Sequence, residues 1–239
     1  MKEILLGLFQ GLTEFLPISS SGHLLFFQEL LKFNLKGIGL ETLLHLATLF
    51  SILIYFRKRI FTYYRDNYIK IFIGILPAGT FAFFFKDLIE NFFEKPDYLF
   101  IFFLLNGFYL LSSRVKEAGE SIDNKKAFII GLAQVFALFP GISRSGTTIT
   151  TALLLRVSPE ESFEFSFYMY PPLALGAFIL TMADLKHLEI LSAGFGFLFA
   201  LLSGLFALFV LEGSIKKKLF PLFGIYTIIL SFISFFLFR

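Results

Sequence analysis

A short polar stretch between two apolar runs constrains the fold of this chain more than any other feature. Residues 140–148 (PGISRSGTT) contain an arginine, two serines and two threonines. The uncharged run before them, residues 127–139, and the run after them, residues 147–155, are each shorter than the ~20 residues that a helix needs to cross a bilayer. Because an arginine at membrane depth is costly and marks a functional site, we interpret the segment as two half-helices that enter the membrane and turn back, with Arg144 at the tip. The alternative is an ordinary interfacial loop whose arginine meets a lipid headgroup.

A second stretch favours the functional interpretation, because it repeats the same pattern. Residues 10–23 (QGLTEFLPISSSGH) fall on residues 134–147 after a shift of 124 positions, and the two copies share a glutamine and the pattern Ile-Ser-x-Ser-Gly. Ser20 falls on Arg144, and His23 falls on Thr147. The chain therefore carries the same broken-helix device twice. The second copy supplies a cation, and the first supplies an acid, a run of serines and a histidine.

The composition of the 239 residues is that of a membrane protein. Hydrophobic residues make up 56% of the chain and charged residues only 16%, with a mean hydropathy of +0.78. The absence of cysteine excludes disulfides, thiolate catalysis and cysteine-ligated metals. The small net charge of +3 is confined to loops, so it concerns membrane topology rather than nucleic-acid binding.

The apolar segments predict an all-α integral membrane protein, built as one membrane domain from two repeats. The first repeat, residues 1–113, contains a re-entrant half-helix pair at residues 4–33. Three spans follow it, at about residues 40–56, 69–85 and 98–113. The polar residues 114–126 form a linker. The second repeat, residues 127–239, has the same plan, with a re-entrant pair at residues 127–157 and spans at about residues 163–183, 191–211 and 219–238.

Because each repeat has an odd number of spans, the second repeat is expected to be inverted relative to the first. Loop charges agree: residues 57–70, 114–126 and 213–218 carry five, four and three Lys/Arg, whereas residues 86–97 and 184–190 carry two and one. The positive-inside rule then puts the first set in the cytoplasm and both termini outside. The six spans and two re-entrant pairs follow the inverted-repeat plan, in which the two tips meet near the middle of the membrane.

The two motifs also carry a resemblance to a known family. EFLPISSSGH (residues 14–23) and PGISRSGTTI (residues 140–149) resemble the signature motifs of the undecaprenyl-diphosphate phosphatases, also called bacitracin-resistance proteins. The resemblance extends to residues 44–46, 76–78 and 164–167, and so covers essentially the whole chain. It implies a multi-pass enzyme of the bacterial cytoplasmic membrane, with an outward-facing site. The enzyme hydrolyses undecaprenyl diphosphate to undecaprenyl phosphate and phosphate, which recycles the lipid carrier for cell-wall synthesis and confers bacitracin resistance.

Binding of a diphosphate requires cations and N–H donors, and the second motif supplies both. Arg144 offers a planar fork of donors, and the half-helices that begin near Ser21 and Ser145 direct unpaired N–H groups at the expected cavity. We therefore expect the substrate-binding residues to be Gln10, Ser19, Ser21, Gly22, Ser143, Ser145, Gly146 and Thr148. The alternative role for the serines and threonine is helix capping.

Hydrolysis also requires a nucleophile and proton transfer, for which the first motif is suited. The resemblance implies a serine nucleophile, and Ser20 occupies the position equivalent to Arg144; we expect Glu14, Ser20, His23 and Arg144 to be catalytic. Water activated by Glu14 is the alternative nucleophile. Many family members carry a glutamate where this chain has Gln10, so Glu14 is the only obvious carboxylate. We therefore expect a Mg²⁺ or Ca²⁺ ion to be held by Glu14 and, mainly, by the substrate diphosphate.

The sequence also allows an alternative function, and it contains two histidines outside the motifs. The same architecture also suits a transporter or flippase of a lipid phosphate or small anion, since the fold alone does not separate the two functions. His45 lies on an apolar span with a weaker case for function, and His187 lies in a loop without an assigned role. The partners expected are a polyprenyl diphosphate and the bilayer, not nucleic acid, and the oligomeric state is open, a homodimer included.

Overall fold

The computed structural model describes residues 2–30, 38–113, 119–183 and 190–238. These residues are helical apart from turns and one isolated bridge between Glu120 and Val157, which confirms the predicted all-α class for the described part of the chain. Most of the loop 184–190, part of the linker and the end of the first re-entrant pair lie outside the described residues, and so does His187.

The helices fall into two sets, before and after the linker. The first set is α1 (Lys2–Phe15), α2 (Ser20–Leu30), α3 (Ile38–Tyr55), α4 (Ile60–Phe84), α5 (Lys86–Phe93), the 3-10 turn η1 (Pro96–Tyr98) and α6 (Leu99–Ser112). The second set is α7 (Asn124–Gln134), the 3-10 turn η2 (Val135–Leu138), α8 (Arg144–Leu154), α9 (Pro159–Tyr168), α10 (Tyr170–Thr181), α11 (Ile190–Lys216) and α12 (Leu222–Phe238).

Each of the six predicted spans coincides with an apolar helix. In the described part of the chain, three helical segments are long enough to cross a membrane: Ile60–Phe84, Pro159–Thr181 and Ala193–Lys216. Three shorter apolar helices occupy the other predicted positions: Gly39–Tyr55, Pro96–Ser112 and Leu222–Phe238. The outer surface of these helices carries large exposed apolar side chains, with Phe61, Phe83 and Leu180 each at least 80% exposed, as expected where lipid replaces water.

The half-helices begin earlier than the apolar pattern predicts. Helix α2 begins at Ser20, one residue before the start near Ser21 that the motif predicts, so the serine run forms its first turn. Similarly, α7 begins at Asn124 rather than 127, because the Asp123 carboxylate caps it by accepting the Lys126 N–H at 2.7 Å. In both cases polar capping residues, rather than apolar ones, set the start of the helix.

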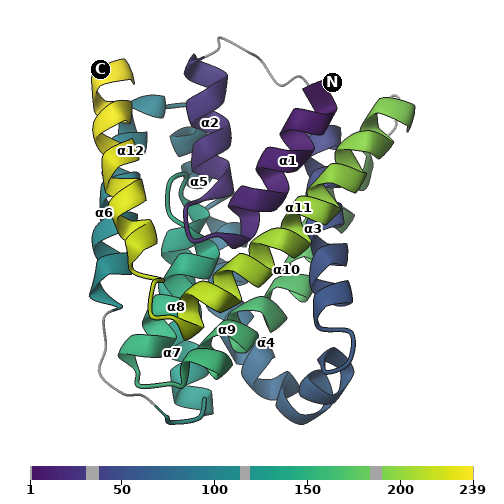
Figure 1. The fold of residues 1–239 in the computed structure, drawn as a ribbon, viewed down its shortest axis with the longest axis vertical. Helices are drawn as coiled ribbons and strands as arrows, with labels where there is room; N and C mark the ends of the chain where they lie inside the picture. Colours follow the sequence, from purple (N-terminus) through teal and green to yellow (C-terminus); the bar gives the residue numbers. More distant parts are fainter. Residues whose placement is uncertain (1, 31–37, 114–118, 184–189, 239) are drawn as a thin grey trace.

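The arrangement of the helices brings the two motifs together at the middle of the bundle (Figure 1). Both termini lie at one end, with α1 and α2 in that half, whereas α7 and α8 lie in the other half. Helix α1 packs closely against α11, where a Cβ added to Gly7 would lie 2.2 Å from the Gly196 carbonyl oxygen. Close contact through small residues is typical of helices packed within a membrane.

A buried aromatic cluster packs next to the motif loops. Phe15, Phe167 and Tyr168 are completely buried, and the rings of Phe15 and Phe167 meet edge to face at 5.5 Å. Phe15 ends α1 and Phe167 lies in α9, so the cluster joins the first motif to the helix after the second. Edge-to-face pairs of this kind favour a fixed ring geometry, which holds the backbone of the first motif in place.

Candidate active site

The loops of the two motifs are bonded directly to each other. The Gly141 N–H donates to Ser19 Oγ at 3.1 Å, and Ser145 Oγ donates to the Phe15 carbonyl oxygen at 2.9 Å. A Cβ added to Gly22 would lie 2.7 Å from Gly141 Cα, so this approach requires glycine. The two tips therefore meet, as the repeat of the motif predicts.

The first serine of each motif caps the half-helix that follows it. Ser19 Oγ accepts the Gly22 N–H at 3.2 Å, and Ser143 Oγ accepts the Gly146 N–H at 3.1 Å. The two bonds are equivalent under the 124-residue shift. In both copies a second serine hydroxyl lies close to the first: Ser21 Oγ is 3.3 Å from Ser19 Oγ, and Ser145 Oγ is 3.1 Å from Ser143 Oγ. Capping, the alternative role, thus occupies several of the hydroxyls expected to bind substrate.

Asn106 of α6 links the two loops, and sequence reasoning missed it. Its Nδ2 donates to the Pro17 carbonyl oxygen at 3.2 Å, and its Oδ1 accepts the Ser143 N–H at 3.0 Å. The side chain is 2% exposed. An asparagine inside an apolar span was the available signal, because a buried amide is expected to be hydrogen-bonded.

Glu14 and Ser20 form the pair with the clearest chemical meaning. Ser20 Oγ donates to Glu14 Oε2 at 2.8 Å, and Gln10 Nε2 donates to the same oxygen at 3.0 Å. The Glu14 side chain is only 9% exposed. A hydroxyl bonded to a nearly buried carboxylate has the geometry of a nucleophile with its general base.

Arg144 lies within electrostatic reach of Glu14 and keeps one terminal nitrogen without a partner. Its Nη1 donates to the Ser166 carbonyl oxygen at 3.0 Å, and its guanidinium lies over the ring of Tyr170. Nη2 is buried and has no hydrogen-bond partner among the described residues. A buried donor of a charged group without a partner is costly, so an anion bound here would restore the missing hydrogen bonds.

The hydroxyls around Arg144 bond to one another and to the backbone, so they position the arginine. Thr148 Oγ1 lies 2.6 Å from Ser166 Oγ and also donates to the Arg144 carbonyl oxygen at 2.9 Å. The Tyr170 hydroxyl lies 2.9 Å from Thr48 Oγ1. Tyr170 and Thr48 were not predicted as site residues, because neither lies in a motif. Their signal is positional: Tyr170 starts the helix after the FEFSF segment, four residues beyond Ser166.

The structure does not bring His23 to the Ser20 hydroxyl. His23 Nδ1 lies 2.7 Å from the Ser19 carbonyl oxygen, and Nε2 lies 2.7 Å from the Tyr226 hydroxyl. Both ring nitrogens are engaged, and the residue is 5% exposed. The imidazole beside Glu14 is instead His45, whose Nδ1 lies 3.6 Å from Glu14 Oε2.

Comparison with known proteins identifies the family. The family model "Bacitracin resistance protein BacA" matches residues 3–233. This chain belongs to the BacA family. A protein of Thermosipho africanus named undecaprenyl-diphosphatase is 41% identical over 251 residues, covering 99% of each chain. Proteins with the same name from Thermotoga petrophila (38% identical, 98% of each chain) and Methanococcus vannielii (36% identical, 97% of each chain) are also similar.

The acidic ligands available in this BacA-family site are few. Within the described residues, no group of three or more His, Cys, Asp and Glu side chains is placed to hold a metal ion. Glu14 is the acidic member of the Ser20 cluster, and its Oε2 already accepts two hydrogen bonds. A divalent cation therefore fits this site only if a substrate supplies most of its oxygen ligands.

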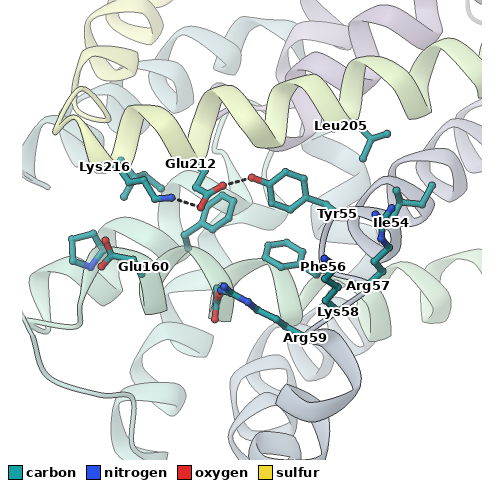
Figure 2. Close-up of a pocket in the computed structure, with 14 residues that line it drawn as sticks. Ile54, Tyr55, Phe56, Arg57, Lys58, Arg59, Glu160, Leu205, Glu212 and Lys216 are labelled. Carbon is teal, nitrogen blue, oxygen red and sulfur yellow. Dashed lines mark hydrogen bonds and ion pairs between the residues drawn. The ribbon is translucent and has the colours of Figure 1, made fainter.

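A separate cavity of about 700 Å³ lies away from the motifs, between the α3–α4 turn, the start of α9 and the end of α11 (Figure 2). Its charged side chains are largely paired with one another: Arg59 with Glu164 at 2.9 Å and Lys216 with Glu212 at 2.7 Å. None of the predicted site residues lines it. This cavity is therefore separate from the residues that the two motifs bring together.

Proposed function

We propose that this chain hydrolyses undecaprenyl diphosphate to undecaprenyl phosphate and inorganic phosphate. The observation that carries the proposal is the 2.8 Å hydrogen bond from Ser20 to Glu14, a carboxylate that interacts electrostatically with Arg144, whose buried Nη2 has no partner among the described residues. Binding of an anion needs the arginine but no hydroxyl–carboxylate pair, so this combination favours chemistry over transport. The relatives' name, undecaprenyl-diphosphatase, supplies the substrate.

The residues suggest a two-step reaction. Ser20 Oγ attacks the terminal phosphorus while Glu14 accepts its proton, the P–O bond to the bridging oxygen breaks, and undecaprenyl phosphate leaves. The departing undecaprenyl phosphate takes the proton from Glu14. The restored carboxylate then accepts a proton from water as water attacks the phosphoserine, the P–Oγ bond breaks, the proton passes to Ser20 Oγ, and phosphate is released. Arg144 donates to the oxygens of the transferred group, where charge accumulates in the transition state. In the alternative mechanism, Glu14 activates water directly and Ser20 only donates to Glu14.

A divalent cation, Mg²⁺ or Ca²⁺, would be held by Glu14 and the diphosphate oxygens. Its chemistry there would be to neutralise phosphate charge. The Glu14 side chain supports this, because a carboxylate oxygen is a ligand that both cations prefer.

The orientation in the membrane belongs to the same proposal. We place the protein in the cytoplasmic membrane of a bacterium as an inverted repeat, with both termini outside and the site facing outward. Two features support this: the termini lie at one end of the bundle (Figure 1), and the basic turn Arg57–Arg59 lies toward the other. The prenyl tail would lie between helices in the lipid. Assembly as a homodimer is compatible with this arrangement.

The deciding experiment measures phosphate release from undecaprenyl diphosphate by the full chain purified in detergent. Detergent removes the two compartments, so a transporter or flippase releases no phosphate, whereas the proposed enzyme does. Ser20→Ala should abolish release. Ser112→Ala is the matched control, because Ser112 lies at the exposed end of α6 and donates only to the Tyr109 carbonyl oxygen. Absence of release by the folded wild-type protein overturns the proposal.

A further inference from the structure

The amide of Gln10 lies between Glu14 and His45, and this position decides which way it faces. Gln10 Nε2 is 3.0 Å from Glu14 Oε2 and 3.2 Å from His45 Nδ1. Turning the amide over would bring its oxygen against the carboxylate oxygen, so that two acceptors would face each other. The carboxylate therefore fixes the NH₂ group in this position.

The two hydrogens of that NH₂ group have two acceptors. One hydrogen is donated to Glu14, and the other points at His45 Nδ1, which must then offer a lone pair. A proton on Nδ1 would place two donors against each other at 3.2 Å. The contact of 3.6 Å between His45 Nδ1 and Glu14 Oε2 is too long for a hydrogen bond that would change this assignment. The imidazole proton therefore lies on Nε2.

The Nε2 edge of His45 is open to a ligand. The His45 side chain is 40% exposed, unlike the other members of the cluster, and no partner of Nε2 occurs among the described residues. The ring is attached to the same network as the Ser20–Glu14 pair. Its Nε2–H is therefore a donor on a ring that is linked through Gln10 and Glu14 to the Ser20 hydroxyl.

We propose that His45 is a substrate-binding residue whose Nε2–H donates to a phosphate oxygen of a prenyl diphosphate, and that Gln10 is the positioning residue that sets this tautomer. The substrate class rests on the proposed function. The assignment also gives Gln10 a role that a glutamate could not fill: a carboxylate at this position accepts hydrogen bonds, and would move the imidazole proton to Nδ1.

The tautomer is measured without turnover. In the full chain with ¹⁵N-labelled histidines, purified in detergent, two-bond ¹⁵N–¹H correlations distinguish the tautomers, and the signals absent from His45→Gln identify His45. We expect the proton on Nε2 in the wild type and on Nδ1 in Gln10→Glu. A wild-type proton on Nδ1, or the same tautomer in both proteins, overturns the role of Gln10.

Binding is tested with saturating farnesyl methylenediphosphonate, a prenyl diphosphate analogue that is not hydrolysed. We expect the Nε2 signal of His45 to shift. No shift in a protein that hydrolyses undecaprenyl diphosphate overturns the role of His45 while leaving the proposed function intact. A shift in a protein without hydrolysis supports the His45 site and rejects the phosphatase.

Kinetics then separate binding from packing. The amide nitrogen of glutamine reaches the position of Nε2, whereas that of asparagine reaches Nδ1. His45→Asn should raise KM about 10- to 100-fold with a smaller change in kcat, since a hydrogen bond to a charged group is lost, and His45→Gln, which keeps an N–H donor at the position of Nε2, should raise KM less. Leu53→Ala, an exposed position on the same helix, is the packing control. Equal effects of Gln and Asn contradict the proposal.

Discussion

The guanidinium of Arg144 lies over the ring of Tyr170, with the guanidinium carbon 4.6 Å from the ring centroid. Tyr170 is held in turn by Thr48, which lies 2.9 Å from the phenol oxygen, and Ser166 fixes Nη1 of the arginine from the other side. A cation between an aromatic face and a backbone carbonyl has little rotational freedom. The free Nη2 is therefore presented in one direction before substrate arrives, which lowers the cost of ordering on binding.

The first prediction concerns the charge and shape of Arg144. Arg144→Ala should reduce phosphate release about 10³-fold or more, because it removes the arginine that stabilises the transferred phosphoryl group. Arg144→Lys should remain badly impaired, because an ammonium point charge replaces the planar fork that donates to the Ser166 carbonyl through Nη1 and keeps Nη2 for the phosphate. Steady-state kinetics, with circular dichroism to verify folding, measures both. Near wild-type activity of Arg144→Lys would contradict the role of the planar guanidinium in phosphate binding.

A second prediction separates the two contributions of Tyr170. Tyr170→Leu removes the aromatic face, worth about 2 kcal/mol for a desolvated cation, and should lower kcat/KM about 30-fold. Tyr170→Phe keeps the face and loses the hydroxyl, which interacts with Thr48 and with Glu14, so a loss of about fivefold is expected. The matched control is Thr48→Val, which removes the Thr48 contact of the same hydroxyl and should lose no more activity than Tyr170→Phe. If Phe and Leu are equally damaging, the ring does not position the arginine.

These network residues mark where sequence reasoning stopped. The polar motifs, their repetition after 124 residues and the apolar runs were enough to predict an all-α membrane protein with broken helices. The meeting of the two tips also followed, and Ser19 with Gly141 now shows the contact. Each of these patterns can be recognised within one continuous segment of the sequence.

The residues that contact the motifs from other helices could not be predicted from the sequence, because their positions depend on how the helices pack. Asn106, Thr48 and Tyr170 reach the site from α6, α3 and α10, and their spacing along the chain carries no information about the motifs. For the same reason the sequence did not predict which histidine lies beside Glu14. His23 is near Ser20 in sequence, but the first turn of α2 directs it toward Tyr226, whereas His45 comes from α3.

A third prediction tests the orientation in the membrane. Because the chain has no cysteine, single cysteines report exposure without background. Lys2→Cys should react with an impermeant thiol reagent in intact cells, and Ser121→Cys should react only after the membrane is opened. The reason is the concentration of Lys/Arg on the linker side of the bundle. Labelling of Ser121→Cys but not Lys2→Cys in intact cells would reverse the topology and move the mouth of the site to the other face.

The last prediction concerns which group attacks phosphorus. If Ser20 attacks, Ser20→Ala should lower kcat by several orders of magnitude with little change in KM, since the lost interaction exists mainly in the transition state. Glu14→Gln should lose about 10²–10⁴-fold, the usual worth of a positioned base. His23→Ala should lose less than Glu14→Gln, because both nitrogens of His23 are engaged with Ser19 and Tyr226.

The two mechanisms also differ in what accumulates. Attack by Ser20 forms a phosphoserine, so a reaction quenched with acid should leave ³²P from the terminal phosphate on the protein, and Ser20→Ala should abolish that label. Attack by water leaves no label, makes Glu14→Gln the most damaging change, and lets Ser20→Ala keep substantial activity, since its hydroxyl then only donates to Glu14. A Ser20→Ala enzyme with more than about a tenth of wild-type turnover has lost less than ~1.4 kcal/mol of transition-state stabilisation. That is too little for a nucleophile, and it would assign the attack to water.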